Sequence, residues 1–221
     1  MEGAGIISTL SLSIVVTTIA VIEFRNLKYS AYAYCLQALL MCSIFIVFAS
    51  KGNPHIYLWA LFAFITKVVI IPFLLLRYIK KTTIREIKPP IGYLPSIIIS
   101  CIIMIIFYNI THVNANFIAP NVEATKEPFR TILAVSFTIF VLGLYCILIR
   151  RDAIKTVHGL CILENGVHLS LVSLAPTLPE TAIVGVVTDV VIAVYLILYV
   201  IYGVYREFGT TDTYQLKNLR W

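Results

Sequence analysis

Seven long apolar stretches limit the fold of this chain more than any other feature. They cover residues 3–22, 30–50, 56–76, 91–110, 129–149, 153–174 and 182–205. About 20 apolar residues in a helix cross the hydrocarbon core of a bilayer. Of the 221 residues, 60% are hydrophobic and only 13% are charged, so little length remains for a soluble domain. The sequence predicts an all-α, polytopic membrane protein of about seven transmembrane helices. The first stretch has no basic flank or small-residue cleavage site, which predicts a retained helix.

The lysines and arginines predict the orientation, because cytoplasmic loops carry an excess of them. Alternating the joints between two sides divides the 17 cationic residues very unevenly. One side holds Arg25, Lys28, Arg77, Lys80, Lys81, Arg85, Lys88, Arg150, Arg151, Lys155, Arg206, Lys217 and Arg220, and the other holds Lys51, Lys126 and Arg130. This asymmetry predicts an N-terminus outside and a cytoplasmic C-terminus. We therefore interpret the net charge of +6 as a topology signal and not as a nucleic-acid-binding surface.

No pattern in the chain is typical of a catalytic or cofactor-binding centre. There is no phosphate-binding loop, nucleotide fingerprint or Ser/His/Asp arrangement. The five cysteines lie within apolar stretches and form no C-x-x-C pair, which disfavours a metal cluster or a disulfide framework. We expect no metal, no cofactor and no enzymatic activity of the chain itself.

Lys67 lies near the middle of the third apolar stretch, too deep to reach the membrane surface easily. A charged side chain at this depth costs at least about 2.5 to 3.5 kcal/mol on insertion scales. Pro72 follows five residues later, and its missing N–H leaves the carbonyl of Val68 without a helical partner. The pattern predicts a locally opened helix beside a functional lysine, with a structural ion pair as the alternative.

Two carboxylates lie inside the last two stretches, Glu164 near the middle of the sixth and Asp189 about a third of the way into the seventh. His168 follows Glu164 by four residues, so both side chains lie on one helix face. A carboxyl and an imidazole in this arrangement can exchange a proton. Two ligands without a third make a metal site the weaker alternative, and His168 could also be a hydrogen-bonded packing residue. Asp189 is either functional or part of a hydrogen bond between helices.

Specific motifs resemble known membrane subunits. The run L-G-L-Y-C-I-L-I-R-R-D-A-I-K-T-V-H-G-L-C-I-L-E-N-G-V-H-L and the later T-D-V-V-I-A-V resemble the three-helix NuoK/MrpC-type subunits of complex I and of multisubunit cation/proton antiporters. F-I-T-K followed by Pro72, L-E-N-G-V-H-L and the tail F-G-T-T-D-T-Y-Q-L-K-N-L resemble the hydrogenase-4 component E family over essentially the whole chain.

The resemblance implies a non-catalytic membrane-arm subunit of a proton- or sodium-translocating membrane-bound [NiFe] hydrogenase or complex I-like oxidoreductase. It implies a plasma-membrane location and antiporter-like and NuoH-like membrane subunits as partners, with a peripheral hydrogenase module as an indirect one. It also implies a four-helix region over residues 1–128 and a NuoK/MrpC-like region over residues 129–221. A subunit of a cation/proton antiporter and a purely structural spacer remain alternatives.

The chain departs from the three-helix pattern at one position. Where that pattern reads G-L-E-x-x-x-N, this chain has Cys161 after Gly159 and Leu160, and its carboxylate is Glu164, one turn further on. Asp189 matches the second family carboxylate. We expect Glu164, Asp189, Lys67 and His168 to form a proton relay, beside the helix opening at Pro72.

Overall fold

Seven helices cross the length of the molecule in the computed structural model, which describes residues 2–50, 54–82, 86, 91–119, 125–175 and 180–213. Each of the seven is long and apolar enough to span a membrane, so the predicted all-α polytopic fold is confirmed. The first span is α1 (Glu2–Glu23) and the second is α2 (Leu27–Ala49). The third consists of α3 (Ile56–Ala63), the π-helical η1 (Phe64–Ile70) and α4 (Ile71–Thr82).

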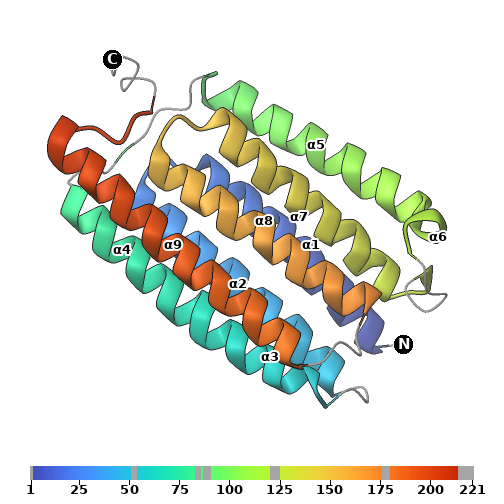
Figure 1. The fold of residues 1–221 in the computed structure, drawn as a ribbon. Helices are drawn as coiled ribbons and strands as arrows, with labels where there is room; N and C mark the ends of the chain where they lie inside the picture. The colour runs from blue at the N-terminus through green and yellow to red at the C-terminus, as the bar shows by residue number, and fades with distance from the viewer. Residues whose placement is uncertain are drawn as a thin grey trace.

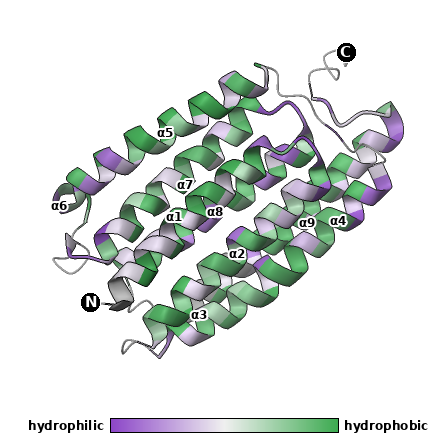
Figure 2. Ribbon diagram, turned by 180° about the vertical axis from the view of Figure 1, so that it is seen from behind, coloured by the Kyte–Doolittle hydropathy of each residue, from purple (hydrophilic) through white to green (hydrophobic). Residues whose placement is uncertain are grey.

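The remaining spans are α5, α7, α8 and α9. Their bounds are Tyr93–Val113 for α5, Phe129–Ile149 for α7, Ala153–Leu174 for α8 and Glu180–Phe208 for α9, and a single turn, α6 (Ala115–Ile118), follows α5. In Figure 1, α1 begins at one end of the bundle and α9 finishes at the other. This is the arrangement expected for an odd number of crossings. Green dominates along the long helices in Figure 2, and purple is concentrated toward the end where α9 finishes.

Four helices, α1, α2, α7 and α8, form the centre of the bundle. Helix α5 packs on the outer side of α7, whereas α3, η1 and α4 pack on α2 and α9 packs on α4 and α8. Helices from before and after residue 128 therefore contact one another extensively. The proposed division into two regions stays a prediction, and both regions contribute to one bundle.

Glycines bring α7 and α8 into the most extensive helix contact of the molecule. A Cβ atom on Gly143 would lie 2.6 Å from the backbone nitrogen of Leu163, and one on Gly166 would lie 2.8 Å from that of Phe140. Only glycine fits at such distances, as is common between membrane helices. Because Glu164 is two residues from Gly166, it lies on the opposite side of α8. The glycine contact thus turns Glu164 toward α2 and the third span.

Asp152 begins α8. Its carboxylate accepts hydrogen bonds from the backbone N–H groups of Ile154 and Lys155, at 2.9 and 3.1 Å, so Asp152 is the N-cap of the helix. Thr211, which follows α9, donates its hydroxyl to the same carboxylate. Burial raises the pKa of Asp152, and these hydrogen bonds oppose that effect. The contact fixes the start of α8 to the segment after α9.

Candidate functional site

The third span is wound more loosely around Lys67 than a regular helix. Across η1 the hydrogen bonds join residues five apart, as in the bond from the Ile71 N–H to the Thr66 carbonyl. Pro72 follows at the start of α4, and the thiol of Cys35 on α2 donates to the Val68 carbonyl at 3.6 Å. The carbonyl that Pro72 leaves without a helical partner thus has a partner on a neighbouring helix.

The Lys67 ammonium is buried in the middle of the bundle, with 1% of the residue exposed. Its Nζ atom lies 2.8 Å from three acceptors on α8: Glu164 Oε2, Asn165 Oδ1 and His168 Nδ1. The contacts with Asn165 and His168 are hydrogen bonds, and the contact with Glu164 is an ion pair. We call Lys67, Glu164, Asn165 and His168 the central cluster.

Glu164 is the anion of the central cluster, and 6% of the residue is exposed. Its Oε1 atom lies 2.8 Å from His168 Nδ1, and its Oε2 atom lies at the same distance from Lys67 Nζ. The contact with Lys67 is an ion pair, and the contact with His168 becomes one when the ring is protonated, but neither oxygen accepts a hydrogen bond of regular geometry. The carboxylate is therefore neutralised electrostatically while both oxygens remain able to accept a hydrogen bond.

His168 contacts the ammonium and the carboxylate through one nitrogen atom. With a proton on Nδ1 the ring donates to Glu164, and without it the ring accepts from Lys67. The other ring nitrogen, Nε2, is buried and has no hydrogen-bond partner among the described residues. A proton that moves between these groups changes which contact His168 makes.

Uncharged polar residues extend the central cluster across α2 to α1. The amide of Asn165 donates to Gln37 Oε1 at 3.3 Å, and the amide of Gln37 donates to Thr18 Oγ1 at 2.6 Å. Gln37 and Thr18 were not among the residues predicted from the sequence. The amide of Gln37 inside an apolar stretch was a signal that could have indicated a buried partner, because an unpaired amide is costly in hydrocarbon.

A second buried group of charges lies where α1 ends and α8 begins. The Arg150 guanidinium donates to Glu23 Oε2 at 2.8 Å, and Ser96 and Ser100 donate to Glu23 Oε1 at 2.7 and 3.2 Å. Lys155 is 1% exposed and donates to the carbonyls of Val21 and Ile22 and to the Ser30 hydroxyl. We call Glu23, Arg150 and Lys155 the end cluster. Arg150 and Lys155 were expected among the cations at the cytoplasmic side, but both side chains are buried in the structure.

Asp189 is not part of the central cluster. Its side chain is exposed on α9, whereas Lys67, Glu164 and His168 are buried together. The structure thus assembles three of the four predicted relay residues and leaves the fourth on an outer helix. An exposed carboxylate on a membrane-spanning helix is costly against lipid.

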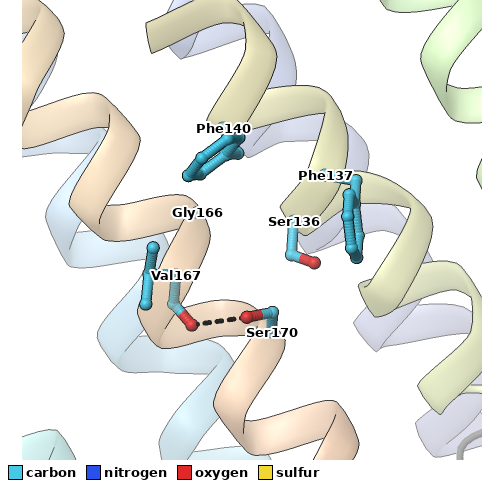
Figure 3. Close-up of a pocket in the computed structure, with 6 residues that line it drawn as sticks. All are labelled: Ser136, Phe137, Phe140, Gly166, Val167 and Ser170. Carbon is cyan, nitrogen blue, oxygen red and sulfur yellow. Dashed lines mark hydrogen bonds between the residues drawn. The ribbon is translucent and has the colours of Figure 1, made fainter. Parts of the chain in front are cut away.

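A small pocket lies on the face of α8 directed away from Lys67. It has a volume of about 150 Å³ and is lined by Ser136, Phe137, Phe140, Gly166, Val167 and Ser170 (Figure 3). The Ser170 hydroxyl donates to the Val167 carbonyl and the Ser136 hydroxyl to the Leu133 carbonyl. None of these lining residues is ionisable. Among the described residues, no three His, Cys, Asp or Glu side chains gather as metal ligands.

Comparisons with known proteins agree with the motifs. Residues 131–221 match the family of NADH-ubiquinone/plastoquinone oxidoreductase chain 4L. The chain is similar over its full length, and over the full length of the relative, to hydrogenase-4 component E of Escherichia coli K12, with 29% identity over 225 residues. The same protein from Shigella flexneri has the same identity and coverage.

A shorter relative matches less than half of the chain. NAD(P)H-quinone oxidoreductase subunit 4L of a Nostoc species is 26% identical over 98 residues, which is 42% of this chain and 97% of that protein. No solved structure matches significantly. Glu164 and His168 lie within residues 131–221, which match the chain 4L family, whereas Lys67 lies outside that range and within the full-length match to hydrogenase-4 component E.

Proposed function

We propose that this chain, a full-length homologue of hydrogenase-4 component E, is a non-catalytic subunit of the membrane arm of a proton- or sodium-translocating, complex I-like oxidoreductase with a membrane-bound hydrogenase. The observation that carries the proposal is the central cluster. A lysine, a glutamate and a histidine lie within 2.8 Å of one another, near the middle of two membrane spans. Ionisable groups at this depth mark ion pathways in membrane proteins.

The central cluster suits a relay better than a fixed ion pair. Each oxygen of Glu164 has spare capacity to accept a hydrogen bond, and His168 has one nitrogen free on the side away from its partners. A charge that changes in a neighbouring subunit would alter the balance among the three groups, because charges interact strongly at low dielectric. A proton could then enter and leave the cluster without any substrate binding to this chain.

Asp189 would serve at the surface where another subunit docks. Its side chain is exposed on α9, and hydrocarbon does not solvate a carboxylate. A polar or cationic group of a neighbouring subunit would therefore pair with it. Antiporter-like and NuoH-like membrane subunits are the partners we propose, with the peripheral hydrogenase module reached through them. The location would be the plasma membrane.

Glu164→Gln in the assembled complex tests this function. Glutamine retains the shape of the side chain but cannot titrate, so ion translocation per electron pair should fall about tenfold or more. The measurement is proton and sodium uptake by reconstituted vesicles, with electron transfer and subunit content followed in parallel. Glu207→Gln, which changes an exposed carboxylate near the end of α9, is the matched control and should translocate at the parental rate.

Parental translocation by an assembled Glu164→Gln complex would contradict the proposal. The chain would then be a structural spacer, with Lys67 and Glu164 as a packing pair. If the native complex contains antiporter subunits but no hydrogenase, and Glu164→Gln abolishes its cation translocation, the chain is instead a subunit of a cation/proton antiporter.

A further inference from the structure

A row of polar side chains on α2 connects the end cluster to the central cluster. Ser30, Tyr34 and Gln37 are each fully buried. Their spacing of four and three residues places them on one helix face. They cover about 10 Å of the helix, at 1.5 Å per residue. The row faces the interior of the bundle, where each of its ends contacts one cluster.

Both ends of the row are fixed by hydrogen bonds. Ser30 accepts from Lys155 Nζ at 2.9 Å and donates to the Val21 carbonyl at 2.7 Å. Gln37 accepts from the amide of Asn165, whose carbonyl oxygen accepts from Lys67. Ser30 thus contacts the end cluster, and Gln37 contacts the central cluster.

Tyr34 occupies the middle of the row. Its hydroxyl lies close to the side chains of Asn165 and Cys161 on α8, yet it makes no hydrogen bond of regular geometry. A buried phenol without a partner is unusual and calls for an explanation. The Glu164 oxygens on the same side of α8 also have capacity to spare. Water between Tyr34 and Glu164 would satisfy both groups, since a polar interior site can hold bound water.

The polar face of α2 is confined to one half of the helix. Beyond Gln37, the buried side chains carry no nitrogen or oxygen, and they are Ala38, Met41, Cys42, Ile44, Phe45, Phe48 and Ala49. On α2, the polar row therefore reaches the central cluster only from the end where Glu23 and Arg150 lie. The distribution of cationic residues predicts that this end is cytoplasmic.

We propose that Ser30, Tyr34 and Gln37 line a water-assisted proton path between the cytoplasmic end of the bundle and Glu164, with Tyr34 as the residue that passes the proton. This inference rests on the proposed function and adds the side of the membrane from which protons reach the central cluster. Water on the Ser30 side gives a proton to the Tyr34 oxygen, and the phenol releases its own proton through water to Glu164. One proton enters and one leaves, so Tyr34 remains neutral and the carboxylate becomes protonated.

The sharpest test is Tyr34→Phe in the assembled complex, because it removes only the hydroxyl. Since that hydroxyl has no regular hydrogen bond, a residue with a purely packing role would tolerate the change. The path predicts instead that proton uptake per electron pair falls about tenfold or more, while every subunit remains assembled. Tyr78→Phe, a buried tyrosine of α4 outside the row, is the matched control and should retain parental uptake.

Ser30→Ala is a second variant in the row. It tests the proton path if the complex with Tyr34→Phe does not assemble. It should lower proton uptake in the same assay. Parental uptake by an assembled Tyr34→Phe complex, or by Ser30→Ala where Tyr34→Phe fails to assemble, would overturn the path. If Glu164→Gln still abolishes uptake in that case, the proposed function stands without this path. Parental uptake in both Tyr34→Phe and Glu164→Gln would overturn the path and the proposed function together.

Discussion

Two buried glutamates in this protein have opposite hydrogen-bonding states. Glu23 accepts from Arg150 on one oxygen and from Ser96 and Ser100 on the other. Glu164 lies at ion-pair distance from Lys67 and His168, but neither of its oxygens accepts a regular hydrogen bond. Both residues are less than a tenth exposed, so burial alone does not distinguish them.

On the proposed function, the difference distinguishes a structural carboxylate from a relay carboxylate. A fully hydrogen-bonded buried ion resists any change of charge, because each partner would lose its own acceptor. Glu23 is of this kind, and it joins α1 to α5 and α7 at one end of the bundle. Glu164 keeps acceptor capacity and shares His168 with a cation, so its proton occupancy can change with less rearrangement.

The largest effect should come from breaking the structural pair. Arg150→Met leaves Glu23 buried without its cation, and such a change costs about 3 to 5 kcal/mol of unfolding free energy. Glu164→Gln should cost less, because the Lys67 ammonium keeps Asn165 and His168 as acceptors and the glutamine carbonyl can replace the lost carboxylate oxygen. Thermal unfolding of both variants in the same detergent measures the difference.

The paired change Glu23→Gln with Arg150→Met is the control, since replacing both partners of a buried pair is often close to neutral. A loss for Arg150→Met no greater than for Glu164→Gln would show that the two glutamates do not differ in the way described here.

A smaller effect is expected from the contact that orients Glu164. In Gly166→Ala, the new methyl group would lie 2.8 Å from the Phe140 nitrogen and from the Ser136 carbonyl oxygen. Overpacking of this kind costs about 1 to 3 kcal/mol, and the shift of α8 should reduce translocation as well. Gly203→Ala on α9 meets no atom within 4 Å, so it should leave unfolding temperature and translocation at or slightly above the parental level. Equal behaviour of the two variants would refute the role of the α7–α8 contact.

The smallest effect concerns a glutamate that is half exposed and lies outside the spans. Partial burial tends to raise the pKa of Glu127, but hydrogen bonds with Thr131 and His112 outweigh it and lower that pKa below its usual value. A lowered carboxyl pKa adds stability above the unfolded-state value, and this stability is lost as pH falls through the folded-state value. Glu127→Gln should therefore change the unfolding temperature only slightly at pH 7. The difference from the parent should disappear below about pH 4, as thermal unfolding at a series of pH values would reveal.

The positions of the spans were predictable because crossing a bilayer depends on local hydropathy. All seven stretches form helices, and an aspartate just before the sixth stretch, Asp152, caps it. The third span shows the limit of such reasoning. Pro72 signals a disturbed helix, but the π-helical turns of η1 and the thiol of Cys35 that binds the Val68 carbonyl are not visible in the sequence. A donor on another helix has no fixed spacing from the acceptor it reaches.

What the sequence alone determined is the set of spans, the uneven distribution of cationic residues and the identity of Lys67, Glu164 and His168 as buried ionisable groups. Only the tertiary structure decided which of these groups meet. Lys67 lies on the third span and Glu164 on the sixth, yet their charged atoms are 2.8 Å apart. Asp189 is exposed, whereas Lys155 is buried. The physical reason is that hydropathy is a property of each segment, while the partner of a buried charge depends on how each helix is rotated. That rotation is set by close contacts between distant residues, such as those of Gly143 and Gly166.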